Sequence, residues 1–221
     1  MIFGKIDYLN LLPFNVFLKR YAKTTRHHMS INYKKGVPSV VNRAFHKRQV
    51  DSAFISSIEA RKYKNASLGI VAKKEVLSVI VTPSTCNVSD SASATSNVLA
   101  KVLHVDGRVV IGDKALKLYL DGVKHTDLAA LWNEKYNLPF VFALLCFHKK
   151  ASYMYSLKKE FLKRKIKIPQ YILLNAQKKS QIPQKDILNY LKYISYEVDF
   201  KAKKSLKKFY NLSSKCLTTI D

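Results

Sequence analysis

The sequence predicts an α/β protein built of two lobes. Short apolar, β-branched stretches alternate with amphipathic ones up to residue 83, and a Ser/Thr-rich stretch then opens a second strand–helix unit. Such alternation is typical of an open sheet with parallel strands. We expect lobe 1 to comprise residues 1–83 and 144–221 and lobe 2 to comprise residues 84–143, with a ligand in the crevice between them.

The first unit supports this prediction element by element. Apolar residues recur at helical spacing or alternate as in a strand, and prolines mark the ends of elements. The expected order is a buried strand at 2–7, a helix at 11–22, an extended stretch at 30–35, a helix after Pro38 that Ser39 caps, the strand "VDSAFISS", a brief helix and the strand 76–83.

The second unit begins in the polar stretch "STCNVSDSASATSN". We expect the helix "VLAKVL", the strand "RVVIGD", the helices "KALKLYL" and "DLAALWNEKY", and the buried strand "LPFVFALLCF" with Cys146 in the core. Beyond residue 148 the pattern predicts helices, with one apolar stripe of Met154, Leu157 and Phe161 and another of Ile187, Leu191 and Ile194.

Composition narrows the class of protein. The chain has 221 residues, 48% of them hydrophobic, enough to bury one sizeable core or two small ones. No apolar run reaches the roughly 18 residues that a membrane helix needs, and "MIFGKID" is charged too early for a secretory signal. Three widely spaced cysteines without a CxxC pair favour reduced thiols, so we expect a cytoplasmic protein.

The formal charge of +24 makes nucleic-acid binding an alternative. In "KAKKSLKKFY", however, the lysines lie opposite Ala202, Leu206 and Phe209 on a helical wheel, which is typical of a solvated helix face. Lysine also outnumbers arginine, whose planar fork reads bases and phosphates better. We therefore expect a small anionic ligand, which the positive field favours, rather than a specific nucleic acid.

Two serine-rich turns are candidate anion sites. Ser56 and Ser57 follow a strand, and Ser93, Thr95 and Ser96 precede a helix. A helix N-terminus offers unpaired N–H groups and partial positive charge, but Ser and Thr also cap helices widely. One such turn in each lobe would suit a substrate with two carboxylates.

Three further positions carry open alternatives. Asn10, in "KIDYLNLLPF", is either the N-cap of the helix that Pro13 helps to start or a residue that faces a ligand. Asp113 is either the N-cap of the next helix or a residue of the cleft. The adjacent His27 and His28 point apart and no HExxH motif exists, so we expect no metal site.

Six stretches in order resemble one family: "DYLNLLPF", "VDSAFISS", "LSVIV", "SASATSN", "VVIGDKAL" and "LPFVFA". They resemble the chorismate dehydratases of the futalosine route to menaquinone and span residues 4–143. The resemblance implies a two-lobed fold similar to type II periplasmic solute-binding proteins. It also implies loss of water from chorismate to give 3-[(1-carboxyvinyl)oxy]benzoate, with no metal or organic cofactor.

Carried over position by position, the resemblance implies that Asn10 is catalytic and hydrogen-bonds the reacting hydroxyl of the substrate. The residues that it implies for substrate binding are Tyr8, Ser56, Ser57, Ser78, Ser93, Thr95, Ser96 and Asp113.

This chain also departs from the family's pattern. The segment "HVDGR" shortens the second lobe, "KKEV" replaces a glycine-containing turn before Ser78, and Leu145 stands where a tryptophan often follows. These changes affect the pocket wall. One alternative is a non-catalytic solute-binding protein, which would need an export signal. Another is the related futalosine-processing enzyme, which is less favoured because the "YLN" and "GDKAL" stretches resemble the dehydratase. The third is the nucleic-acid-binding protein.

Overall fold

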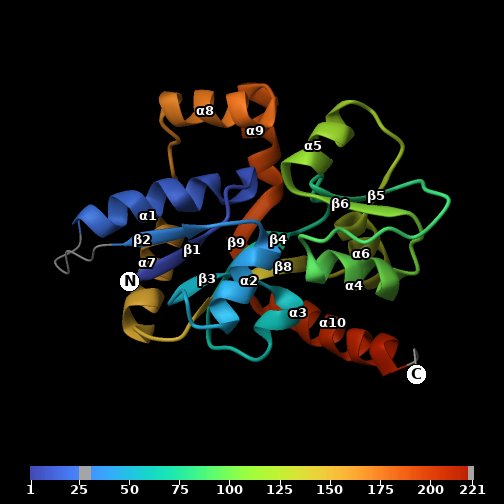
Figure 1. The fold of residues 1–221 in the computed structure, drawn as a ribbon, viewed down its shortest axis with the longest axis horizontal. Coiled ribbons are helices and arrows are strands. Elements are labelled where there is room, and N and C mark those ends of the chain that lie inside the picture. Colours follow the sequence, from blue (N-terminus) through green and yellow to red (C-terminus); the bar gives the residue numbers. More distant parts are fainter. Residues whose placement is uncertain (25–30, 219–221) are drawn as a thin grey trace.

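A computed structural model describes residues 1–24 and 31–218, which form two sheets with helices around them (Figure 1). His27 and His28 lie outside the described residues. The strands are β1 (Ile2–Lys5), β2 (Asn32–Lys35), β3 (Ser52–Ser56), β4 (Asn65–Ala72), β5 (Val79–Thr82), β6 (Arg108–Ile111), β7 (Thr126–Asp127), β8 (Phe140–Phe147) and β9 (Ile194–Glu197).

The helices are η1 (Leu9–Leu11, a 3-10 turn), α1 (Leu12–Thr24), α2 (Pro38–His46), α3 (Ser57–Ala60), α4 (Ala94–Leu103), α5 (Gly112–Leu120), α6 (Leu128–Tyr136), α7 (Ala151–Lys163), α8 (Gln170–Ser180), α9 (Gln184–Tyr190), η2 (Leu191–Tyr193) and α10 (Phe200–Thr218). Within the described residues, no helix is long and apolar enough to cross a membrane.

The larger sheet has the strand order β2-β1-β3-β8-β4-β9. The expected parallel pairing is right for β1 with β2 and for β1 with β3. It is wrong for β8 and β9, which run antiparallel to their neighbours. The chain leaves this sheet after β4 and re-enters it at the same end, where Ala72 pairs with Phe140, so β8 inserts between β3 and β4 in the reverse direction.

The smaller sheet has the order β6-β5-β7, with antiparallel pairs. Its central strand β5 was expected at the end of lobe 1, yet it pairs with β6 across Val79 and Ile111. The lobe boundaries at 83/84 and 143/144 stay a prediction. We propose that the first crossing between lobes lies between β4 and β5, because that is where the chain changes sheet.

Three strands were not expected from the sequence, namely the two-residue β7 and the longer β4 and β9. Strand β4 contains Gly69, which weakens a strand pattern. Strand β9 contains Ile194, which was expected on a helical stripe with Ile187 and Leu191. That stripe is wrong beyond α9, because the segment pairs with the edge of β4. Ser39 is not the cap of α2 either, because Val37 is the N-cap residue and Pro38 takes the first helical position.

Helix α10 joins the two halves of the molecule. It packs against α4 and β8 and runs beneath both in Figure 1. Trp132 of α6 is fully buried, lies edge-on to Phe209 of α10, and donates its indole N–H to Ser205 at 3.0 Å. The amphipathic pattern predicted for this helix is confirmed, since Ala202 is buried while its lysines are exposed.

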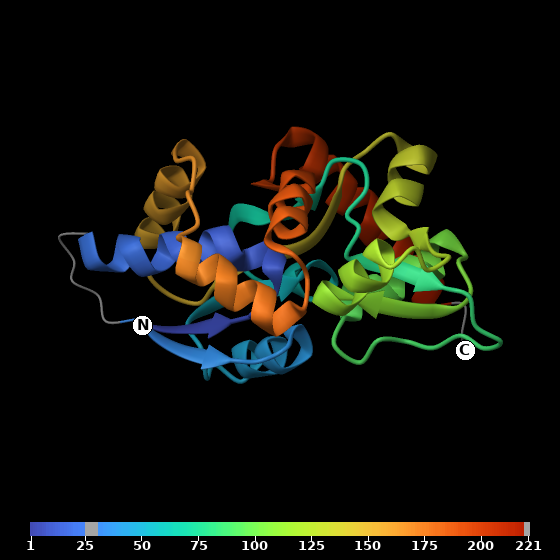
Figure 2. The same cartoon turned by 90° about the horizontal axis from the view of Figure 1, so that it is seen from above.

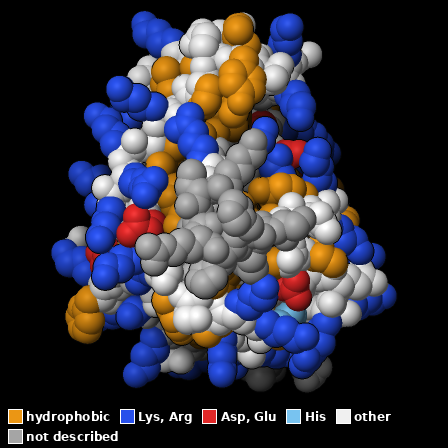
Figure 3. Space-filling model, turned by 90° about the vertical axis from the view of Figure 1, so that its left-hand side faces the viewer, with side chains coloured by type: hydrophobic (Ala, Val, Ile, Leu, Met, Phe, Trp, Pro, Cys, Tyr) orange, Lys and Arg blue, Asp and Glu red, His pale blue; other side chains and the backbone are white. Residues whose placement is uncertain are grey.

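Helices α8 and α1 lie one over the other at the far side of the larger sheet, as Figures 1 and 2 show from two directions. Figure 3 views the molecule from the left-hand side of Figure 1, where α1 ends. Lys and Arg side chains are spread over this face with apolar and neutral surface between them, and few acidic groups interrupt them. The positive charge on this face is therefore a diffuse coat.

Candidate functional site

Asn10 lies inside η1, whose N-cap residue is Tyr8, so the N-cap interpretation of Asn10 is wrong. The backbone is fixed there from a distant part of the chain, because the hydroxyl of Tyr196 donates to the carbonyl oxygen of Asn10 at 2.6 Å. The side-chain oxygen Oδ1 of Asn10 is buried and has no hydrogen-bond partner among the described residues. An unpaired buried acceptor costs about 1–3 kcal/mol, so it marks a place where a donor is missing.

This oxygen belongs to a small space lined almost entirely by buried residues, here called the inner cavity, of about 60 Å³. Its polar lining consists of the side chains of Asn10, Ser56, Ser78, Ser93 and Ser96, and its other lining residues are apolar, glycine or proline. The cavity lies where β1 and β3 end and where β5 and α4 begin. The sequence-predicted residues Asn10 and these four serines thus come together from both sheets.

Ser56 is held in place by the buried side chain of Asn42. Asn42 of α2 donates its amide to Ser56 Oγ at 3.0 Å and accepts the Ser56 backbone N–H at 3.3 Å. Asn42 is 2% exposed. Its position among the apolar residues of "VVNRAF" was the available sequence signal, because a buried amide needs partners.

Ser78 sits at the end of a tight turn. Its backbone N–H donates to the Val76 carbonyl at 2.7 Å, and Leu77 between them has φ +60°, which costs a non-glycine residue conformational energy. Asp127 holds the turn, since one of its carboxylate oxygens accepts the Val76 and Leu77 N–H groups at 2.9 and 2.7 Å. The side chain of Tyr190 then donates to Ser78 Oγ at 2.8 Å.

At the start of α4, Ser93 is the N-cap. Its hydroxyl accepts the Ser96 backbone N–H at 3.1 Å and donates to Ser96 Oγ at 2.8 Å. The capping interpretation therefore holds for Ser93. Because Ser93 uses its proton on Ser96, the Ser96 hydroxyl is left to donate into the inner cavity.

Ser57 and Thr95 do not line the inner cavity. Their hydroxyls lie 3.3 Å apart, and Thr95 Oγ1 also accepts the Ile58 N–H at 3.2 Å. Both side chains are buried at the contact between α3 and α4. The structure thus places them at the contact between α3 and α4, and their role in substrate binding stays a prediction.

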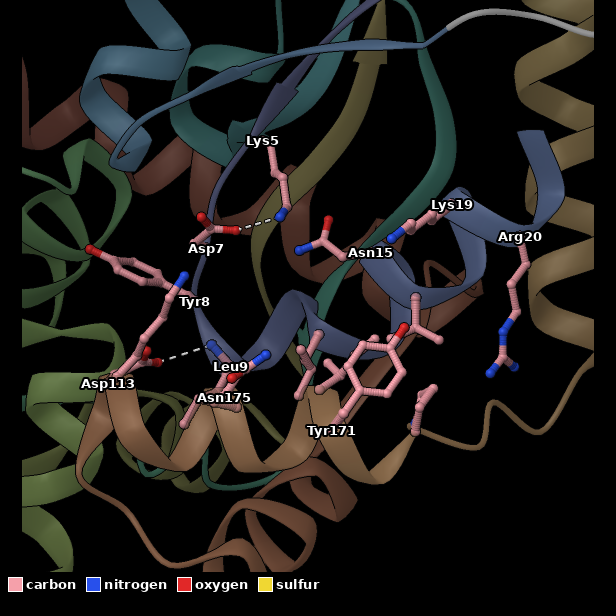
Figure 4. Close-up of a pocket in the computed structure, with 16 residues that line it drawn as sticks. Lys5, Asp7, Tyr8, Leu9, Asn15, Lys19, Arg20, Asp113, Tyr171 and Asn175 are labelled. Carbon is pink, nitrogen blue, oxygen red and sulfur yellow. Dashed lines mark hydrogen bonds and ion pairs between the residues drawn. The ribbon is translucent and has the colours of Figure 1, made fainter. Parts of the chain in front are cut away.

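Tyr8 and Asp113 line a second hollow, here called the outer groove, of about 460 Å³ between α1 and α8. Figure 4 shows it, with Asn15, Lys19 and Arg20 from α1 and Tyr171 and Asn175 from α8. Asp113 lies in the first turn of α5, whose N-cap is Ile111, so it is not the helix cap.

A two-part wall separates the hollows. The Leu9 N–H donates to the Asp113 carboxylate at 3.0 Å, and the Tyr8 ring covers Gly112. A Cβ at Gly112 would lie 2.8 Å from that ring, and its φ of +69° also favours glycine. Burial raises the pKa of Asp113 to about 6, and the Leu9 hydrogen bond offsets part of this rise.

The sequence profile of the menaquinone biosynthesis family matches residues 1–105 and 100–215. The chorismate dehydratase of Campylobacter jejuni subsp. jejuni, serotype O:23/36 (strain 81-176), is 54% identical over 214 residues, or 95% of this chain and 96% of that protein. The chain belongs to the menaquinone biosynthesis family. The family resemblance predicted from six short stretches is thereby confirmed.

Solved structures confirm the fold of this family member. Protein AF1704 of Archaeoglobus fulgidus superposes with a TM-score of 0.72 at 14% identity, over 97% of this chain and 96% of that one. The CA3427 gene product of Candida albicans, which has the generic periplasmic binding protein fold, superposes with a TM-score of 0.55 at 14% identity, over 99% and 94%. The predicted periplasmic-binding-protein-like fold is confirmed.

The inner cavity of this family member is lined by neutral groups. No Asp, Glu, His, Lys or Arg side chain of the described residues lines it. Its polar atoms are hydroxyls that donate and accept, and one amide that does both. Such a site suits chemistry that needs orientation and hydrogen bonding rather than a protein base.

The sequence analysis missed four residues that hold the cavity, namely Asn42, Asp127, Tyr190 and Tyr196. Each acts through a contact to a segment far away in the chain, so no local motif marks it. For the two tyrosines, the only signal was their position among apolar residues in a predicted helical region.

Proposed function

We propose that this protein is a chorismate dehydratase, a lyase that removes water from chorismate to give 3-[(1-carboxyvinyl)oxy]benzoate. The observation that carries the proposal is the buried, unpartnered Oδ1 of Asn10 in a cavity lined by neutral donors. The 54% identity to a curated chorismate dehydratase supports it.

The substrate chemistry fits a cavity without a lining base. Chorismate carries a hydroxyl beside a ring C–H that is activated through the diene toward the ring carboxylate. Loss of both groups makes the ring aromatic, which supplies the driving force, so the proposed step needs no cofactor. The enzyme has to orient the ring and exclude competing reactions. The substrate's own enolpyruvyl carboxylate is the proposed acceptor of the ring proton, which it returns to the departing hydroxyl as the C–O bond breaks, so that water leaves.

The role proposed for each polar residue of the inner cavity follows from the hydrogen bonds that it can donate or accept. Asn10 Oδ1 accepts a hydrogen bond from the reacting hydroxyl, which gives this buried acceptor a donor. Ser78 and Ser96 offer hydroxyl protons to the carboxylates, and the N-terminus of α4 adds partial positive charge beside Ser96. These neutral donors bind a dianion without burying a countercharge.

The inner cavity has to enlarge before it admits chorismate. A volume of about 60 Å³ equals about two water molecules at their share of liquid volume. The wall formed by Tyr8 and Leu9 against Gly112 and Asp113 contains one hydrogen bond and one ring contact. We propose that this wall parts to admit the substrate and that the basic outer groove is the approach.

The direct test is incubation of the purified protein with chorismate, followed by chromatography for the aromatic enol ether. We expect conversion that depends on protein concentration, against a control without protein. Binding of chorismate, seen as a rise in Tm, without any enol ether would favour the non-catalytic solute-binding alternative. Turnover of a futalosine nucleoside instead would favour the related enzyme.

The remaining expectations depend on this proposal. A small dianionic partner, no specific nucleic acid and a cytoplasmic location are consistent with a biosynthetic dehydratase, and they stay predictions.

A further inference from the structure

Tyr190, the last residue of α9, is a fully buried phenol next to the inner cavity. Its hydroxyl donates to Ser78 Oγ at 2.8 Å. An oxygen that accepts this proton keeps its own hydrogen for another acceptor. The Ser78 hydroxyl, which lines the cavity, is therefore free to direct its hydrogen into the cavity.

The same phenol contacts the side chain of Asn10. Burial raises the pKa of Tyr190 far above its ordinary value, and its hydrogen bonds with Ser78 and Asn10 act in the lowering direction. Because the Tyr190 hydroxyl gives its one proton to Ser78, it can only accept a hydrogen bond from Asn10, so the Asn10 amide NH2 group is the donor. Its carbonyl oxygen Oδ1 is then the atom left unpartnered.

These contacts form one chain of hydrogen bonds, from the Asn10 amide to the Tyr190 hydroxyl to the Ser78 hydroxyl. We propose that Tyr190 is a positioning residue that fixes the amide of Asn10 with its oxygen toward the substrate and turns the Ser78 hydroxyl proton into the cavity. The inference rests on the proposed function, because it assigns these two atoms to chorismate.

The hydroxyl, and not the ring, carries this role. If the ring of Tyr190 only filled space, phenylalanine would pack equally well at this fully buried site. Because burial keeps the phenol protonated, Tyr190 acts as a fixed donor and not as the proton acceptor of the reaction. Without this hydroxyl, the Asn10 amide is free to turn and Ser78 is free to donate to other oxygens.

The test is Tyr190→Phe, with Tyr153→Phe as the matched control. Tyr153 of α7 is also partly buried, packs beside Tyr21, and its hydroxyl has no partner among the described residues. We expect Tyr190→Phe to lower kcat on the order of 10- to 100-fold with little change in KM, as for a misplaced catalytic group. Tyr153→Phe should match wild type in both.

A second readout needs no turnover. In nitrogen-15-labelled protein, the side-chain amide signal of Asn10 is assigned by its loss in Asn10→Asp. We expect Tyr190→Phe to shift that signal in the substrate-free protein and Tyr153→Phe to leave it in place. An unmoved signal in Tyr190→Phe would overturn the inference, whatever the rate.

The two readouts also separate this inference from the proposed function. If wild type leaves chorismate unchanged while the Asn10 signal shifts in Tyr190→Phe, the proposed function fails and the positioning of the amide stands. If wild type converts chorismate and Tyr190→Phe keeps its kcat, the positioning role is wrong. Should Tyr190→Phe unfold, Ser78→Ala breaks the same chain from its other end and takes the same tests.

Discussion

The inner cavity and the outer groove lie on opposite sides of the segment Tyr8–Leu9–Asn10, yet they differ in almost every property. The outer groove is open and ringed by charged side chains, among them Lys19 and the ion pair of Lys5 with Asp7 at 2.8 Å. The inner cavity has about an eighth of the volume and is lined by neutral groups of mostly buried residues.

The comparison shows where this fold can place charged side chains. An unpaired charge in a cavity lined by buried residues is costly, because burial removes its hydration. The same charge in an open groove stays hydrated and still attracts anions. The protein therefore keeps its cations outside and presents hydroxyls and an amide inside, where hydrogen bonds are stronger because water is excluded.

The largest effect is expected when a charge is placed in the inner cavity. Asn10→Asp keeps the shape but replaces a donor–acceptor with an anion, which repels a dianionic substrate by roughly 4 kcal/mol at about 4 Å and an effective dielectric of 20. We expect loss of most dehydratase turnover, measured with chorismate under saturating conditions. Asn211→Asp, on the exposed surface of α10, is the control and should keep its rate.

The Asn10 prediction fails if Asn10→Asp turns over chorismate at the wild-type rate with an intact fold. A large fall in Tm in the same variant would instead point to a structural role, which the structure argues against because Asn10 caps no helix.

The wall between the two hollows contains a buried acid, and its titration should show in stability. Asp113 has a pKa of about 6 in the folded protein against an ordinary value of 3.8. The folded state thus holds a proton that the unfolded state has lost between these values, so this group's contribution to stability is present below pH 4 and is lost as the pH rises through 6.

Asp113→Asn removes this titration and keeps an oxygen to accept the Leu9 N–H. We expect the variant to be more stable than wild type at pH 7, by up to about 3 kcal/mol from a shift of about two pKa units, and equal to it near pH 4. Urea unfolding across this range measures the difference. Asp121→Asn, at the exposed end of the same helix, should not reproduce the pattern.

The ring contact of the wall can be tested with a pair of glycines. Gly112 and Gly122 have similar positive φ values of 69° and 73°, but only at Gly112 would an added Cβ meet the Tyr8 ring. Both alanine variants carry the backbone strain of about 1–3 kcal/mol. We expect Gly112→Ala to lower Tm further than Gly122→Ala and to raise the KM for chorismate. Equal Tm values would show that the ring contact is dispensable.

The smallest effect is expected in the outer groove. Lys19→Ala with Lys179→Ala removes two exposed cations that border it. We expect kcat/KM for chorismate to fall about two- to fivefold at low salt, and the deficit to vanish at high salt because exposed charges are screened. Lys203→Ala on α10 is the control. A deficit that persists at high salt would mean that these lysines contact the substrate directly.

Local sequence determined much of this protein. Side-chain periodicity is a local property, so it can be recognised from the sequence alone. It predicted the apolar runs that form β1, β3, β6 and β8 and the amphipathic segments that form α1 and α10. The serine-rich turns also indicated Ser56, Ser93 and Ser96, and the family resemblance added Asn10 and Ser78; the fold gathers these five residues into one cavity.

Only the tertiary structure decided which strands are neighbours and which side of a segment faces which hollow. Strands β4 and β9 form because they pair with each other and with β8, over separations that no local pattern encodes. Tyr8 and Asn10 are two residues apart, yet one packs on Gly112 and the other lines the inner cavity. Tyr190 reaches Ser78 across 112 residues of chain. Such contacts depend on how packed elements satisfy buried polar groups together, and this is a property of the whole fold.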